Sequence, residues 1–238
     1  MKLLVADYDG TFFINEDDLK NNIMAINKWQ QQGNKFMIST GRSYSSIKNQ
    51  VIINHIPYDY LSCADGSIIY DKHDNILKMY EMDNEIIEPY KKFYDNINYE
   101  EIQFSYPRGY SNILLNDKEL LGINVCISTS NYNDIIVNDF IKLSKYHKDY
   151  SFLNYMHPNY SYLCIKPSGV NKSSTINYLK EELGLKPKDI YVIGDSDNDF
   201  EMIKKYNGVC MNTSCNKILK ICHKTYLSVS DYIEDSIN

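Results

Sequence analysis

The stretch Leu3-Leu4-Val5-Ala6-Asp7-Tyr8-Asp9-Gly10-Thr11 decides the fold of this 238-residue chain. Four consecutive apolar residues followed by a polar, glycine-containing segment predict a short buried strand that ends in a tight turn. Asp7 and Asp9 are two positions apart, so in an extended chain both carboxylates point to the same side. In open α/β sheets, ligands bind at the carboxyl ends of the strands, which is where these two side chains are expected.

The segments after this turn alternate between helix and strand patterns. A helix pattern over 17–32 is followed by a strand over 36–40, a helix over 44–53 and a strand over 60–63. Strands that alternate with helices predict a parallel sheet with right-handed crossovers.

The middle of the chain has a different organisation. Helix patterns over 85–94 and 135–146 occur among strand patterns over 122–128, 151–155 and 160–165. Elements that pair locally in this way predict a separate α+β unit. The parallel pattern then resumes with a helix over 173–183 and strands over 190–193 and 208–211.

We therefore predict an α/β protein with a Rossmann-like core of parallel strands and one inserted domain. The core is expected from residues 1–81 and 163–238, and the inserted α+β domain from residues 82–162.

The overall composition narrows the classes of partner. The chain has a formal net charge of −6 and no block of basic residues, which argues against nucleic acid as a partner. No apolar run approaches the roughly 20 residues that span a membrane, and the apolar start is too short for a signal peptide. We expect a cytoplasmic protein whose six scattered cysteines stay reduced; the sequence predicts no oligomeric state.

A second acidic motif, Gly194-Asp195-Ser196-Asp197-Asn198-Asp199, also follows a predicted buried strand. Either acidic motif alone is compatible with a surface turn or a helix N-terminus. Together they would gather Asp7, Asp9, Asp195 and Asp199 at one sheet edge. So many carboxylates cannot all stay ionised without a cation, and oxygen-only ligands favour Mg²⁺.

Two further segments suit the binding of a phosphate. Ser39-Thr40-Gly41-Arg42 ends the second strand, so a hydroxyl, backbone N–H groups and a cation lie at the same edge. Lys172 stands just before a helix start and could supply a point charge. A simple turn and a solvated lysine are the alternatives for these two segments.

This ordered set resembles the haloacid dehalogenase superfamily of phosphohydrolases, and more closely its Cof-type branch of sugar phosphatases, which includes sucrose-phosphate phosphatases. The four motifs of the family are matched by Asp7–Thr11, by Thr40 before Gly41-Arg42, by Lys172 and by Gly194–Asp199. The inserted domain resembles the α/β cap of this branch. Family members commonly carry Asn-Gly after the third strand, where this chain has Asp65-Gly66.

The resemblance implies roles for particular residues. Asp7 is expected to be the nucleophile and Asp9 the general acid and base. Phosphate or substrate binding is expected from Thr40, Gly41, Arg42, Lys172 and Asn198. Mg²⁺ binding is expected from Asp7, Asp9, Asp195 and Asp199, the last directly or through water.

The implied function is Mg²⁺-dependent hydrolysis of a small phosphorylated metabolite, such as a sugar phosphate, through an aspartyl phosphate. A sugar phosphomutase on the same core is an alternative, because such enzymes share it. A non-catalytic binding module is another alternative. Its expected mark is the loss of a nucleophile, base or metal aspartate, whereas all of these positions are filled here.

Overall fold

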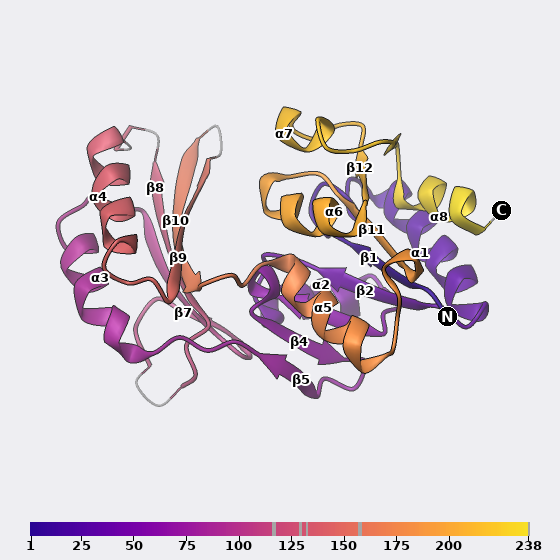
Figure 1. Ribbon diagram of the computed structural model, residues 1–238, viewed down its shortest axis with the longest axis horizontal. Coiled ribbons are helices and arrows are strands. Elements are labelled where there is room, and N and C mark those ends of the chain that lie inside the picture. Colours follow the sequence, from indigo (N-terminus) through magenta and orange to yellow (C-terminus); the bar gives the residue numbers. More distant parts are fainter. Residues whose placement is uncertain (116–117, 129, 132, 157–158, 238) are drawn as a thin grey trace. The chain divides into compact units, whose positions relative to one another are not determined.

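The computed structural model of the chain describes residues 1–115, 118–128, 130–131, 133–156 and 159–237. The chain forms two compact units (Figure 1). Unit 1 contains residues 1–42, 46–78 and 171–238, and unit 2 contains residues 43–45 and 79–170. Among the described residues, no helix combines the length and the apolar character needed to cross a bilayer.

Unit 1 is built on an eight-stranded sheet with the order β13-β12-β11-β1-β2-β3-β4-β5. The strands are β1 (Leu3–Ala6), β2 (Lys35–Ser39), β3 (Tyr60–Cys63), β4 (Ile68–Asp71), β5 (Ile76–Met79), β11 (Ile190–Gly194), β12 (Val209–Met211) and β13 (Thr225–Tyr226). From β13 to β3 all neighbours are parallel, whereas β4 is antiparallel to β3. The predicted α/β fold with a parallel core is confirmed, and β4, β5 and β13 are additions.

Helices cover both faces of this sheet. They are α1 (Glu16–Gln31), α2 (Tyr44–Ile53), α5 (Lys172–Glu182), α6 (Phe200–Tyr206), α7 (Asn216–Leu219) and α8 (Val229–Ile237), with 3-10 turns η1 (Ala64–Gly66), η3 (Pro187–Asp189) and η4 (Asp197–Asp199). Val192 of β11 belongs to a buried cluster with side chains of α5 and α6. The preceding residue, Tyr191, contacts Trp29 of α1 and Tyr232 of α8. Successive strand residues therefore pack on opposite helical layers, as the pleat requires.

Unit 2 contains a five-stranded antiparallel sheet with the order β7-β6-β8-β10-β9. Its elements are η2 (Asn84–Ile86), α3 (Ile87–Tyr94), β6 (Glu101–Tyr106), β7 (Gly109–Ser111), β8 (Gly122–Ser128), α4 (Asp134–Ser144), β9 (Tyr150–Met156) and β10 (Tyr160–Pro167). Figure 1 shows α3 and α4 side by side along one face of this sheet. Phe104, Val125, Phe140 and Leu163 form part of the core between the two layers.

The boundaries of the inserted unit differ from the expected 82–162. The first boundary lies between Lys78 and Met79, and the second between Val170 and Asn171. β10 pairs with β8 on one side and β9 on the other, so it cannot be divided between two domains. The apolar pattern of this strand is visible in the sequence, but the sheet to which it belongs depends on partners elsewhere in the chain.

Candidate active site

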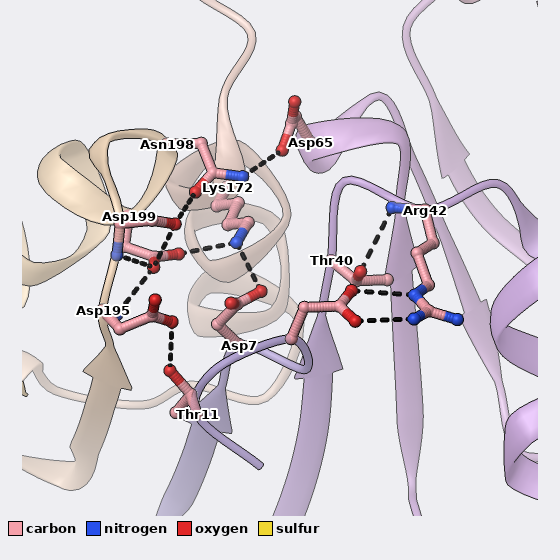
Figure 2. A network of polar contacts seen from close by, with 11 residues as sticks. Asp7, Thr11, Thr40, Arg42, Asp65, Lys172, Asp195, Asn198 and Asp199 are labelled. Atoms are coloured by element: carbon pink, nitrogen blue, oxygen red, sulfur yellow. Dashed lines mark hydrogen bonds and ion pairs between the residues drawn. The ribbon is translucent and has the colours of Figure 1, made fainter. Parts of the chain in front are cut away.

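Four loops of unit 1 meet at the carboxyl ends of its parallel strands (Figure 2). Asp7 follows β1, Thr40 follows β2, Asp65 follows β3 and Asp195 follows β11. β1 lies between β2 and β11, so the loops at its end are close in space although they are far apart in the sequence. This is the edge at which open α/β sheets bind ligands.

Lys172 is the buried cation of this site. Its side chain is fully buried, and its Nζ donates to Asp7 Oδ1 and to Asp199 Oδ1, each at 2.6 Å. Asn171 caps α5 by accepting from the backbone N–H of Ser173, which fixes the start of the helix that carries Lys172. Burial opposes the charge, but Asp199 and Asp7 raise the pKa of Lys172 above its ordinary value. The ammonium group therefore stays charged.

Asp7, Asp195 and Asp199 form an acidic triad. One carboxylate oxygen from each lies within 4.8 Å of the others. Burial raises the pKa of Asp7 well above its ordinary value; Lys172 opposes this shift, and Asp199 and Asp195 add to it. If all groups are ionised, three carboxylates and one ammonium leave two negative charges. This net charge, together with ligand atoms that are all oxygen, fits a hard divalent cation.

The members of the triad are held by different partners. Asp199 Oδ2 accepts from the backbone N–H groups of Asp195 at 2.9 Å and Ser196 at 3.0 Å, while its Oδ1 accepts from Lys172. Asp195 Oδ1 accepts from Thr11 Oγ1 at 2.6 Å. Both oxygens of Asp199 are thus occupied by donors, so it orients the loop and Lys172.

Asp9 is oriented differently from Asp7. Its carboxylate accepts two hydrogen bonds from Arg42, from Nε at 2.8 Å and from a terminal nitrogen at 2.6 Å. The Arg42 guanidinium also lies over the ring of Tyr8, 5.1 Å from its centroid. The Asp9 side chain is 50% exposed, and its carboxylate is not part of the acidic triad. The two hydrogen bonds from the Arg42 guanidinium fix the orientation of the Asp9 carboxylate.

Thr40 and Gly41 follow β2, the strand next to β1. Thr40 is buried, and its Oγ1 accepts from the backbone N–H of Arg42 at 3.1 Å. A methyl group added at Gly41 would lie 3.1 Å from Asp65 Oδ1, so the backbone at this position passes close to that carboxylate. Glycine at position 41 therefore leaves room for Asp65.

Asp65 and Asn198 bridge two loops above Lys172 (Figure 2). Asn198 Nδ2 donates to Asp65 Oδ1 at 3.0 Å, and Asn198 Oδ1 accepts from Ser196 Oγ at 2.7 Å. Asp65 has a φ of 52°, a left-handed conformation that is uncommon for residues other than glycine. Backbone strain of this kind often occurs at functional sites.

The structure gathers most of the predicted site residues at one edge. Lys172 contacts Asp7 and Asp199, and Asp195 completes the acidic triad with these two aspartates. The Asp9 carboxylate is paired with Arg42, and Asn198 is paired with Asp65. Sequence reasoning assigned no role in the site to Thr11, Asp65 or Ser196. Asp65 could have been noticed because it departs from the family pattern. The contact between Thr11 and Asp195 has no sequence signal, since the two residues are 184 positions apart.

We expect Gly10→Ala to reduce turnover about a hundredfold, the loss typical of a misplacement of about 1 Å at a catalytic centre. Gly10 has a φ of +81°, and an added methyl carbon would lie 2.7 Å from Asp195 Oδ2. That carboxylate would have to move away from Asp7. Steady-state kinetics of the purified variant measure the effect.

Gly33→Ala is the matched control for this substitution. Gly33 has a similar φ of +78°, but an added methyl group would meet nothing within 4 Å. Both variants should lose about 1–2 kcal/mol of unfolding free energy from the left-handed conformation. Only Gly10→Ala should lose turnover. Equal turnover in the two variants would show that Gly10 does not protect the position of Asp195.

A model of the haloacid dehalogenase-like hydrolases matches residues 4–145 and 116–232. A curated relative, 5-amino-6-(5-phospho-D-ribitylamino)uracil phosphatase YcsE of Bacillus subtilis, is 25% identical over 99% of this chain and 90% of its own length.

Solved structures show the same fold. A haloacid dehalogenase superfamily phosphatase from Bacteroides thetaiotaomicron superposes with a TM-score of 0.80 at 17% identity, over 99% of this chain and 93% of its own. A sugar phosphatase of haloacid dehalogenase subclass IIB superposes with a TM-score of 0.77 at 14% identity, over 99% of both chains. The similarity therefore extends over both units.

Proposed function

The chain belongs to the haloacid dehalogenase-like hydrolase family and is a phosphatase of that family, and we propose that it hydrolyses a small phosphorylated metabolite with the help of Mg²⁺. In this proposal the phosphoryl group passes through Asp7 as an aspartyl phosphate. The observation that carries the proposal is the buried contact of Asp7 with Lys172 inside the acidic triad. A carboxylate beside a cation and a metal site suits phosphoryl transfer, in which catalysis is mostly positioning and charge neutralisation.

We assign direct metal binding to Asp7 and Asp195. Asp199 already accepts from Lys172 and from two backbone N–H groups, so its proposed role is to hold Lys172 and the loop, with any metal contact through water. When bound, Mg²⁺ would neutralise negative charge on the carboxylates and on the phosphoryl oxygens. The remaining steps depend on the side chains of the chain itself.

Asp7 is the proposed nucleophile and Asp9 the proposed general acid and base. The pair between Asp9 and Arg42 is partly exposed, with side-chain exposures of 50% and 31%. Because the pair is partly exposed, water can replace its hydrogen bonds when a substrate displaces Arg42 from Asp9. In this proposal Arg42 then interacts with the phosphoryl group, while Asp9 protonates the leaving oxygen.

Lys172 and Thr40 are the proposed contacts of the phosphoryl oxygens, together with the backbone at Gly41. The Thr40 hydroxyl accepts from the Arg42 N–H, which leaves its hydrogen to donate to an oxygen of the substrate. Asn198 is also assigned to substrate binding, with the Asp65 bridge holding its amide group in place.

A sugar phosphate, or another phosphorylated polyol, is the proposed substrate class. The support is the similarity to a subclass IIB sugar phosphatase and to a phosphatase whose substrate name includes a phosphoribitylamino group. We assign substrate selection to unit 2, the proposed cap. A panel of phosphorylated metabolites should be assayed for released phosphate and for isomerised sugar phosphate. Release without isomerisation supports the proposal, and isomerisation would indicate a phosphomutase.

We expect a chelator to abolish phosphate release and Mg²⁺ to restore it. The reason is the excess of negative charge in the triad, which a divalent cation balances. Ca²⁺ should support activity poorly, because it prefers looser and higher coordination. Full turnover in excess chelator would contradict the metal requirement.

Two aspartates of the same loop provide a matched comparison. Asp195 belongs to the triad, whereas Asp197 is partly exposed near Lys217, at 3.5 Å. Asp195→Asn should raise the Mg²⁺ concentration needed for half-maximal activity by about tenfold or more, and Asp197→Asn should leave it unchanged. The same Mg²⁺ requirement in both variants would show that Asp195 is not a metal ligand.

A further inference from the structure

A cavity lies in unit 1 at the amino ends of the parallel strands, opposite the edge that carries Asp7. It has a volume of about 580 Å³ and is lined by the residues around the starts of β11, β12 and β13 and by parts of α6 and α8. Figure 1 shows α8 on the side of unit 1 where both chain ends lie. Ligand pockets typically measure about 300–1,000 Å³, so this cavity has the size of a small-molecule site.

The charge of this cavity is opposite to that of the whole chain. The chain has a net charge of −6, but the cavity is lined by Lys188, Lys205 and Lys224, with His223 beside them. Asp235 is the acidic residue of the lining, and it accepts from Lys224 at 2.7 Å and from the Tyr226 hydroxyl at 2.6 Å. The hydrogen bond from Lys224 lowers the pKa of Asp235 below its ordinary value, so this carboxylate is already paired.

Lys188 and Lys205 differ from Lys224 in having no acidic partner. Over the part of the chain that the structure describes, neither lysine makes an ion pair or a hydrogen bond with a carboxylate. Lys188 lies in η3 just before β11, and Lys205 lies in the last turn of α6. Two unneutralised ammonium groups thus border the same cavity, which favours an anion there.

Tyrosine rings form the other part of the lining. Tyr232 packs against Tyr226 with ring centroids 5.0 Å apart and against Tyr191 with centroids 6.1 Å apart. All three line the cavity. Tyr232 is buried, so the half-buried rings of Tyr191 and Tyr226 are the ones that can contact a planar ligand. Aromatic pairs form at centroid distances of about 4.5–7 Å.

We propose that this cavity binds a small phosphate ester that carries a planar ring, of the nucleoside monophosphate class. Lys188 and Lys205 would contact the phosphate, and the tyrosine group would contact the ring. An ammonium group binds a phosphate as a point charge, and stacking does not need a particular base. The site is separate from the proposed phosphatase centre and does not depend on that proposal.

The single tryptophan of the chain is a reporter for this site. Trp29 packs edge-on against Tyr191, with ring centroids 5.5 Å apart, and its indole N–H donates to Lys35 O at the start of β2. Trp29 therefore lies at the same end of the sheet as the cavity. A ligand that stacks near Tyr191 should change the fluorescence of Trp29.

The test is a titration of the full chain with adenosine 5′-monophosphate in excess chelator, so that no turnover occurs. Trp29 fluorescence and calorimetry should both show saturable binding. Adenosine and inorganic phosphate should each bind about tenfold more weakly or worse, because each lacks one of the two contacts. The absence of saturable binding by both methods, or equal binding of phosphate alone, would overturn the proposal.

Three variants locate the binding. The double variant Lys188→Ala/Lys205→Ala should bind adenosine 5′-monophosphate about tenfold more weakly or worse, with unchanged phosphatase activity. Lys142→Ala/Lys145→Ala makes the same charge change in unit 2 and should bind normally. Asp7→Asn should also bind normally, because Asp7 lies at the opposite edge of the sheet. Normal binding by the first variant, or lost binding by either of the others, would overturn the assignment.

Discussion

Asp7→Asn should release no measurable phosphate from any substrate, with a loss on the order of 10⁴-fold or more, because the proposed mechanism uses the Asp7 carboxylate as the nucleophile. The Asp7 side chain lies directly after β1 and is held by Lys172 at 2.6 Å, so the fold presents this carboxylate to the site. The asparagine side chain has nearly the same size, and the loss would therefore report chemistry and not packing.

Asp9→Asn is the comparison that separates the two roles. Removal of a general acid and base costs about 10²–10⁴-fold, so this variant should be strongly impaired but still able to become phosphorylated. A substrate with a good leaving group needs little proton transfer for that first step. Intact-protein mass spectrometry after an acid quench should detect a phosphoryl adduct on the Asp9→Asn protein.

The two aspartates could also have their roles exchanged. A phosphoryl adduct on the Asp7→Asn protein, or unchanged turnover by that protein, would assign the nucleophile to another residue. Circular dichroism of both variants should match that of the unsubstituted chain. This comparison separates a chemical defect from a folding defect.

Lys172→Met should have the second large effect, on stability as well as on turnover. The ammonium group is fully buried between Asp7 and Asp199, and the substitution leaves these carboxylates without their cation. Breaking a buried ion pair in this way typically costs about 3–5 kcal/mol of unfolding free energy. Urea denaturation in excess chelator measures this loss.

Lys180→Met is the control on the same helix. Lys180 is partly exposed and pairs with the adjacent Glu181, so its substitution should change the unfolding free energy by less than about 1 kcal/mol. Adding Asp199→Asn to Lys172→Met should recover part of the lost stability, because one unpaired charge is removed. Mg²⁺ should stabilise Lys172→Met more than the unsubstituted chain, since the triad is then more negative. Equal stability of the two lysine variants would contradict a buried ion pair at Lys172.

Much of the fold was predictable from local patterns. The apolar run Leu3–Ala6 became β1, the helical spacing before Gly33 became α1, and the patterns over 44–53, 60–63 and 122–128 became α2, β3 and β8 with the same bounds. Buried residues recur with the period of each helix or strand, so a short window of sequence is enough to predict the type of element. Five strands were missed, namely β4, β5, β6, β7 and β13. β5, for example, is only partly buried, and its apolar residues give little contrast.

The sequence by itself determined the parallel α/β core, the inserted α+β unit and the loops that carry Asp7, Thr40, Lys172 and Asp195, because strand ends and turns depend on neighbouring residues. Only the tertiary structure decided how these side chains pair. It placed Lys172 between Asp7 and Asp199, and directed Asp9 to Arg42. It also assigned β10 to unit 2. Contacts between residues 33 to 165 positions apart depend on how the strands are ordered in the sheets, which no local pattern specifies.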